Sequence, residues 1–101
     1  MVMKAGTKAL VIDPKDNVAT ALEDLGAGNA VVLSIKDLEK EIVLRNDIPV
    51  GHKFATTEIA GGDDVIKYGE VIGQSFERIA AGDHVHIHNV TSPGKKRKKE
   101  T

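Results

Sequence analysis

Three histidines alternate along a short segment near the carboxyl end of the chain, which reads His84-Val85-His86-Ile87-His88-Asn89. On a strand, this alternation places the three imidazoles on one face, with neighbours about 6.6 to 6.8 Å apart. His84 and His86 could then share one metal ion, and an imidazole near neutral pH also suits proton transfer. The outer two would lie about 13 Å apart on a straight strand, so a site of three histidines needs a bulge or a strong twist. The alternative is a solvated polar face, with Val85 and Ile87 in the core.

Two further groups of polar side chains could contribute to a site. His52 and Lys53 follow Gly51, where we expect a tight turn and where a cation could hold a carboxylate as a point charge. The alternative is a turn with an exposed charged residue. The segment Lys67-Tyr68-Gly69-Glu70 places a cation, a phenol and a carboxylate within four residues, enough for a hydrogen-bond network or a base. Tyr68 could equally be an aromatic at the edge of the core, because aromatic residues make up only 3% of the chain.

The composition limits the chemistry that these residues could perform. A chain of 101 residues with 41% hydrophobic content indicates one globular domain. The absence of cysteine excludes a disulfide scaffold, a thiolate nucleophile, a cysteine-ligated zinc site and an iron–sulfur cluster held by this chain. Residues 1–8 lack the apolar stretch of a signal peptide, and no window approaches the roughly 20 apolar residues of a membrane span. We therefore expect a cytoplasmic protein that does not contact a membrane.

The charges are unevenly distributed along the chain. Of its 14 basic and 15 acidic residues, five basic residues and one acidic residue lie in 95–100, which leaves an acidic body. We predict an ordered domain over 1–94 and a basic, disordered tail or linker over 95–101. The body has no basic stripe with interleaved aromatic residues, and Gly61-Gly62 precedes two aspartates that would repel a phosphate, so neither nucleic-acid binding nor nucleotide chemistry is expected. Because so short a chain has a small core, we expect association with a partner or with itself.

Apolar spacing predicts the elements that must position these side chains. A strand is expected over 9–12, where Asp13-Pro14 stops it. A short helix is expected over 16–25, with Asp16 as its N-cap and Gly26 at its end, because apolar residues fall at i, i+3, i+4 and i+7. Two strands are expected over 30–35 and 42–44, joined by a charged, exposed connection.

A short pattern recurs four times, over 25–31, 48–54, 59–65 and 79–85. Each copy has an apolar anchor, two further residues, a glycine, two more residues and an apolar residue of a strand. The glycines are Gly28, Gly51, Gly62 and Gly82. We predict that each has positive φ and reverses the chain into the next strand. Because these glycines are unevenly spaced, the pattern favours a compact, loop-rich β fold with several equivalent corners over a solenoid.

Four blocks of the sequence, over 16–21, 47–55, 67–73 and 82–89, resemble the amino-terminal SAF domain of altronate dehydratase. The resemblance spans roughly 12–89 and implies a mainly β, SAF-type β-clip fold, to which we add the short helix near the amino terminus. It also implies a role in a family of sugar-acid lyases that includes altronate and galactarate dehydratases and sulfolactate sulfo-lyase. In that family the module is fused to a large catalytic domain or is a separate small subunit.

The resemblance further implies a reaction and a set of roles. The reaction is dehydration of altronate to 2-keto-3-deoxygluconate, with a larger catalytic subunit as partner and with iron(II) or manganese(II) that this subunit could hold. The catalytic residues would be His86, His88 and Glu70. The substrate-binding residues would be His52, Lys53, Lys67, Tyr68 and Asn89, and the metal ligands His84 and His86. The alternative is a carbohydrate-binding or assembly module without catalytic function.

Overall fold

The computed structural model describes residues 8–35 and 38–91, and these residues form β-strands and loops without a helix. The strands are β1 (Ala9–Leu10), β2 (Val18–Ala21), β3 (Ala30–Ile35), β4 (Leu38–Val43), β5 (Lys53–Ala55), β6 (Asp64–Lys67), β7 (Glu70–Ser75), β8 (His84–Val85) and β9 (Val90–Thr91). The mainly β prediction is therefore confirmed. The predicted tail over 95–101 lies outside the described residues.

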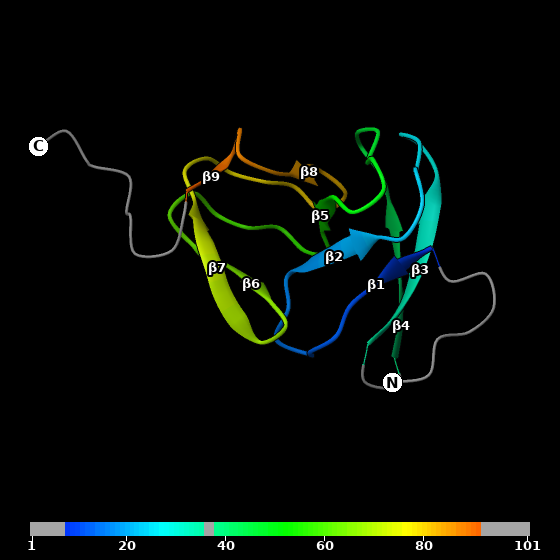
Figure 1. Cartoon of the computed structure of the whole chain (residues 1–101), viewed down its shortest axis with the longest axis horizontal. Coiled ribbons are helices and arrows are strands. Elements are labelled where there is room, and N and C mark those ends of the chain that lie inside the picture. The colour runs from blue at the N-terminus through cyan, green and yellow to red at the C-terminus, as the bar shows by residue number, and fades with distance from the viewer. Residues whose placement is uncertain (1–7, 36–37, 92–101) are drawn as a thin grey trace, which may run out of the picture.

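The strands form three antiparallel sheets, with a central sheet in the order β1-β2-β5-β8. The hairpin β3–β4 lies on one side of the central sheet, and the sheet β6-β7-β9 lies on the other (Figure 1). The described residues include no helix long and apolar enough to span a bilayer.

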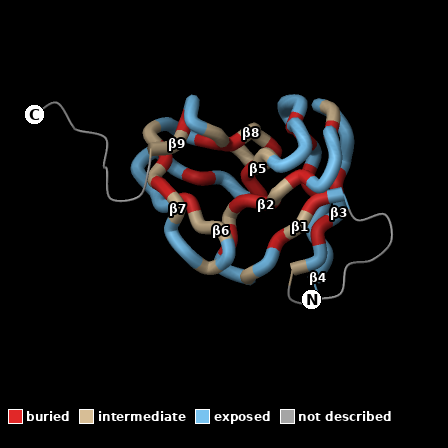
Figure 2. The backbone as a smooth tube through the Cα atoms, in the orientation of Figure 1, coloured by how far each residue is buried: buried red, intermediate tan, exposed pale blue. Residues whose placement is uncertain are grey.

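Two hydrophobic clusters fill the space on either side of the central sheet. Neighbouring residues of one strand belong to different clusters, because strand side chains alternate between faces. Ala19 and Phe54 pack in the first cluster, whereas Val18 and Ala55 pack in the second. The buried segments accordingly follow the central strands and the loops beside them (Figure 2). Phe54 is the one aromatic residue in the buried core of the described part of the chain, as the aliphatic composition predicts.

The four predicted corners are confirmed. Their glycines have φ values of 88°, 83°, 93° and 91° in chain order. In each corner, the residue after the glycine donates its N–H to the carbonyl of the residue after the anchor. With the positive φ of the glycine, this hydrogen bond is typical of a type II turn. The anchors are buried, and they pair by reciprocal backbone hydrogen bonds of 2.8–2.9 Å. These pairs are Leu25 with Ile48 and Ile59 with Ile79.

The predicted helix over 16–25 is wrong, because this segment contains β2 and one corner anchor. A strand that is covered on both faces has apolar residues at consecutive positions. The apolar residues of β2, together with Leu25, therefore show the spacing that is typical of a helix. Asp16 is not a helix cap: its carboxylate accepts the N–H groups of Asp13 and Gly69 at 3.1 and 2.8 Å. The predicted connection between the next two strands is also too long, because β4 already begins at Leu38.

Candidate functional site

The pairing of β5 with β8 brings the histidines together. Phe54 lies opposite His84 in the antiparallel register, so continuing the register places His52 opposite His86. The rings of His52 and His86 are stacked, with centroids 4.4 Å apart. Nδ1 of His52 lies 2.9 Å from Nε2 of His84, within hydrogen-bond distance. The fourth ring, of His88, has its centroid 5.2 Å from that of His84.

Hydrogen bonds to backbone and asparagine groups hold the backbone of this histidine cluster. The N–H of His52 donates to the carbonyl of Pro49 across the turn at Gly51, and the N–H of His84 donates to Oδ1 of Asn46 at 2.8 Å. Asn89 is only 3% exposed. Its Oδ1 accepts the N–H of His86 at 3.0 Å, and its Nδ2 donates to the carbonyl of His84 at 2.9 Å. The predicted substrate contact of Asn89 stays a prediction, and the structure gives its amide a role in positioning the loop.

Burial and neighbouring cations favour the neutral form of two histidines. Burial lowers the pKa of His84 below 6.5, with further lowering from His88 and His52. Burial also lowers the pKa of His86, and His52 and Lys53 add to this effect. Neutral rings near pH 7 have a free lone pair that can accept a proton or bind a metal.

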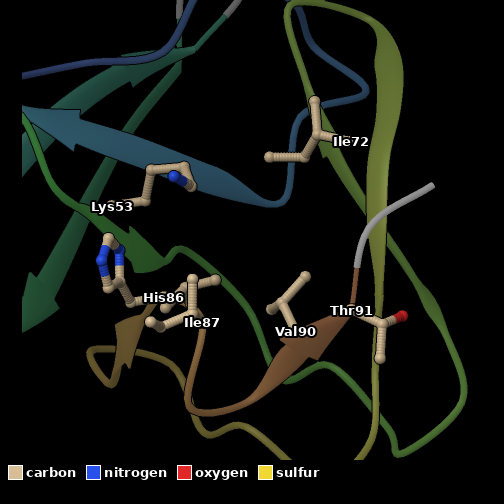
Figure 3. Close-up of a pocket in the computed structure, with 7 residues that line it drawn as sticks. Lys53, Ile72, His86, Ile87, Val90 and Thr91 are labelled. Atoms are coloured by element: carbon tan, nitrogen blue, oxygen red, sulfur yellow. The ribbon is translucent and has the colours of Figure 1, made fainter. Parts of the chain in front are cut away.

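The charge of Lys53 acts on two parts of the molecule, the histidine cluster and Lys67 of the β6–β7 hairpin. Burial lowers the pKa of its ammonium below 10.5, and the positive charge of Lys67 lowers it further. Lys53 and His86 lie at one end of an open pocket of about 190 Å³, and Val90 and Thr91 lie at the other (Figure 3). Ile72, Val85 and Ile87 also line the pocket. The arrangement therefore offers a cation and an imidazole beside an apolar surface.

The segment predicted to hold Lys67, Tyr68 and Glu70 forms the turn between β6 and β7. Tyr68 and Gly69 both have positive φ, as a two-residue type I′ hairpin requires. Tyr68 is 52% exposed, which argues against a place in the core, and the ammonium of Lys67 lies 4.8 Å from its ring centroid. Glu70 pairs with Lys67 in the strand register, and within the described residues it makes no hydrogen bond or ion pair with the histidines.

The histidine segment differs from a straight strand. β8 ends at Val85 and the chain turns, which explains why the rings of His84 and His88 are close. Val85 is buried as the solvated-face alternative required, but Ile87 is 81% exposed. The sequence interpretation did not assign His52 to the metal ligands. The corner pattern could have indicated His52, because Gly51 and Gly82 occupy equivalent corner positions, and the strands that follow them are β5 and β8.

The donors in this cluster can be compared with the metal that the resemblance implies. Potential ligand atoms of His52, His84 and His86 all lie within 4.8 Å of one another. Imidazole nitrogen suits iron, nickel, copper and zinc, whereas manganese favours carboxylate, carbonyl and water ligands. The residues present therefore fit iron(II) better than manganese(II).

The fold and the site define a small β domain with a polar, histidine-rich edge, and comparisons with known proteins agree. A family profile described as "Altronate/galactarate dehydratase SAF domain" matches residues 7–93. The chain belongs to this family.

Individual relatives show how differently the domain is used. The chain is 51% identical over 74 residues to an altronate dehydratase of Escherichia coli strain K12, covering 73% of this chain and 14% of that protein. It is 34% identical over 84 residues to a (2R)-sulfolactate sulfo-lyase subunit alpha of Chromohalobacter salexigens, covering 80% of this chain and 89% of that subunit. A galactarate dehydratase of E. coli K12 is 34% identical over 80 residues, covering 77% of this chain and 14% of that protein. The chain thus spans about a seventh of the dehydratases it matches and most of the sulfo-lyase subunit.

Proposed function

We propose that this chain is a component of a sugar-acid lyase that dehydrates altronate to 2-keto-3-deoxygluconate, in partnership with a larger catalytic subunit or domain. The identity of 51% to an altronate dehydratase supports the substrate. The match over most of a sulfo-lyase subunit alpha supports an arrangement in which the domain is a separate chain. We also propose that the mainly β architecture is a β-clip.

The histidine cluster beside Lys53 is the observation that carries this proposal. A domain that served assembly alone would not need four imidazoles at one edge of its central sheet, two of them with lowered pKa values. The cluster lies next to an open pocket, where a partner could supply the remaining walls. Ile87, which is 81% exposed next to the cluster, would contact that partner.

Dehydration requires removal of a proton beside a carboxylate and protonation of the departing hydroxyl. In the proposed mechanism, Lys53 and Lys67 attract the substrate carboxylate, and His52 hydrogen-bonds to it. Glu70 accepts the proton, the lone pair of His86 would help to hold iron(II), and the exposed His88 donates a proton to the leaving hydroxyl. Iron(II), when bound, would act as a Lewis acid that stabilises the developing negative charge.

The remaining predicted residues lie at the tip of the neighbouring hairpin. Tyr68 and Glu70 are both exposed there, which places their side chains where a larger partner could reach them. We propose that Tyr68 contacts substrate and that Glu70 acts as a base only once the partner has closed the site.

Replacement of a domain tests the proposal directly. The matching region of the E. coli altronate dehydratase would be exchanged for residues 8–91 of this chain, and altronate dehydration would be assayed with iron(II). We expect the chimera to be active, and its His86→Ala and His88→Asn variants to be folded but impaired. The isolated chain should be inactive, and turnover of about 1 to 1,000 per second by the isolated chain would contradict a dependent subunit.

The alternative is a carbohydrate-binding or assembly module, and the same chimeras distinguish it. If the unmodified chimera is active and both histidine variants retain full activity, the domain contributes assembly rather than chemistry. Sugar-acid binding by the isolated chain, measured by calorimetry, would then identify a binding module.

A further inference from the structure

We propose that His52, His84 and His86 together bind one divalent transition-metal ion of the group that favours imidazole, such as iron(II), cobalt(II) or zinc(II). The site would belong to this chain alone and would not need the larger partner. The inference concerns where an ion is held, and its test does not depend on lyase activity.

The distances between the donor atoms support a shared ion. Nitrogen ligands lie about 2.0 to 2.1 Å from zinc, so two such ligands in a tetrahedral site lie about 3.3 Å apart. The corresponding separation between His52 Nδ1 and His84 Nε2 is 2.9 Å, and the whole set of three lies within 4.8 Å. A metal ion would replace the proton that now joins His52 and His84. Small rotations of the three rings would complete the site.

The backbone of each proposed ligand is already held in place. His52 follows the turn at Gly51, which the anchor Ile48 fixes in the core. His84 lies in β8 and its N–H is bound by Asn46, whereas the N–H of His86 is bound by the buried side chain of Asn89. Since the ligands come from the end of the turn before β5, from β8 and from the loop after β8, binding requires the folded chain. Free histidines on a mobile segment would lack this preorganisation.

The ligand chemistry predicts which ions bind. The set contains three imidazole nitrogen donors and no carboxylate, so magnesium and calcium, which require oxygen ligands, should not compete. Three imidazoles leave the charge of a divalent ion uncompensated and at least one coordination position open. Lys53 adds positive charge beside the cluster. The open position should therefore accept an anionic oxygen ligand, such as a carboxylate or hydroxide.

A cobalt(II) titration of the full 101-residue chain, freed of metal with a chelator, tests the site. We expect visible absorption bands of coordinated cobalt that saturate at one ion per chain, and displacement by zinc but not by excess magnesium. His52→Gln, His84→Gln and His86→Gln should each weaken binding by more than about 100-fold, above the 10- to 100-fold cost of losing an outer partner of a ligand. His88→Gln is the matched control and should bind like the unchanged chain.

Circular dichroism shows whether each variant is folded, and His52→Gln is the most informative because His52 is in a surface turn and only partly buried. Unchanged cobalt binding by folded His52→Gln, or equal loss in His88→Gln, would refute the proposed ligand set. Absence of one-to-one binding by the unchanged chain would refute the site itself. Neither result bears on the lyase proposal, because the titration contains no substrate. An inactive chimera with intact cobalt binding would refute only the lyase proposal.

Discussion

The corner pair Leu25 and Ile48 and the corner pair Ile59 and Ile79 have nearly the same backbone but different surroundings. In both pairs the anchors exchange two backbone hydrogen bonds, and each anchor is followed by a glycine with positive φ. The first pair belongs to the cluster around Phe54, and the second to the cluster around Val65. The repeated backbone therefore does not determine function.

The strands that follow the corners differ between the two members of each pair. Gly28 and Gly62 are followed by the outer hairpin strands β3 and β6, whereas Gly51 and Gly82 are followed by β5 and β8. Because β5 and β8 pair with each other, residues just after these two glycines become neighbours. These positions carry His52 and Lys53 in one corner and Asp83 and His84 in the other, whereas the equivalent positions of the two remaining corners carry Asn29, Ala30, Asp63 and Asp64. One corner of each pair thus builds the site, and the other starts a hairpin.

The largest effect is expected at Gly82. A Cβ at Gly82 would collide with the backbone carbonyl oxygen of Val43 in β4, whereas a Cβ at Gly62 would meet nothing within 4 Å. Both substitutions also place alanine at positive φ. We expect Gly82→Ala to lower the free energy of unfolding by about 2 to 5 kcal/mol and Gly62→Ala by about 1 to 2 kcal/mol. Urea unfolding measures both losses, and equal losses would refute the close packing of Gly82 against the backbone of β4.

The corners also show what the sequence could predict. An anchor, a glycine and their spacing are local features, and only glycine readily adopts positive φ, so the four turns and the burial of their anchors were predictable. Helix and strand in 16–25 were not distinguishable locally. Val18 and Ala21 pack in different clusters and are both apolar because the sheet is covered on both faces, and that covering comes from segments distant in sequence.

The site was also predictable only in part, because some of its contacts are local in the sequence and others join distant segments. The spacing of His84 and His86 in the sequence shows that the two rings can meet. The neighbour His52 becomes visible only once β5 is known to pair with β8, which is a contact across 32 residues. The bend after Val85 depends on Asn89, whose side chain binds backbone groups that no periodic pattern reveals.

Asn89 and Asn17 provide the next comparison, because each binds two backbone groups through both ends of its side-chain amide, Asn89 in β8 and the loop after it and Asn17 in β6. Asn89 holds the histidine loop, whereas Asn17 donates to the carbonyl of Asp64 and accepts the N–H of Ile66. Asn89→Ala and Asn17→Ala should each cost about 1 to 3 kcal/mol of unfolding free energy. Only Asn89→Ala should also weaken cobalt binding. Equal cobalt binding by the two folded variants would show that the loop does not need Asn89 to position its histidines.

A smaller change in the free energy of unfolding is expected from pH, and it should arise from the histidine cluster. The pKa values of His84 and His86 are lowered below 6.5 in the folded chain, mainly by burial, so the unfolded chain binds protons more readily. Their contribution to stability is therefore complete above about pH 6.5 and decreases as the pH falls through the lowered values. The metal-free chain should show this loss in urea unfolding between about pH 7 and 5. A double variant, His84→Gln with His86→Gln, should be less sensitive, and an unchanged slope would assign the loss to other groups.

The smallest effects concern the residues just before the anchors. In the first pair, Asp24 accepts the N–H of Val50 and Asp47 accepts the N–H of Ala27, at 2.8 and 2.9 Å, so each carboxylate binds the opposite corner. In the second pair the equivalent residues, Glu58 and Arg78, form an exposed ion pair of 2.6 Å.

Loss of a carboxylate leaves a backbone N–H without its protein partner, so Asp47→Ala should lower the free energy of unfolding by about 0.5 to 1.5 kcal/mol. Arg78→Ala removes an exposed ion pair that water and salt replace, so the urea midpoint should not change measurably. Repeating both measurements at high salt separates the two mechanisms, because screening acts on the ion pair and hardly on a short hydrogen bond to the backbone. A loss in Arg78→Ala equal to that in Asp47→Ala would mean that the second corner pair depends on charge as much as the first depends on its carboxylates.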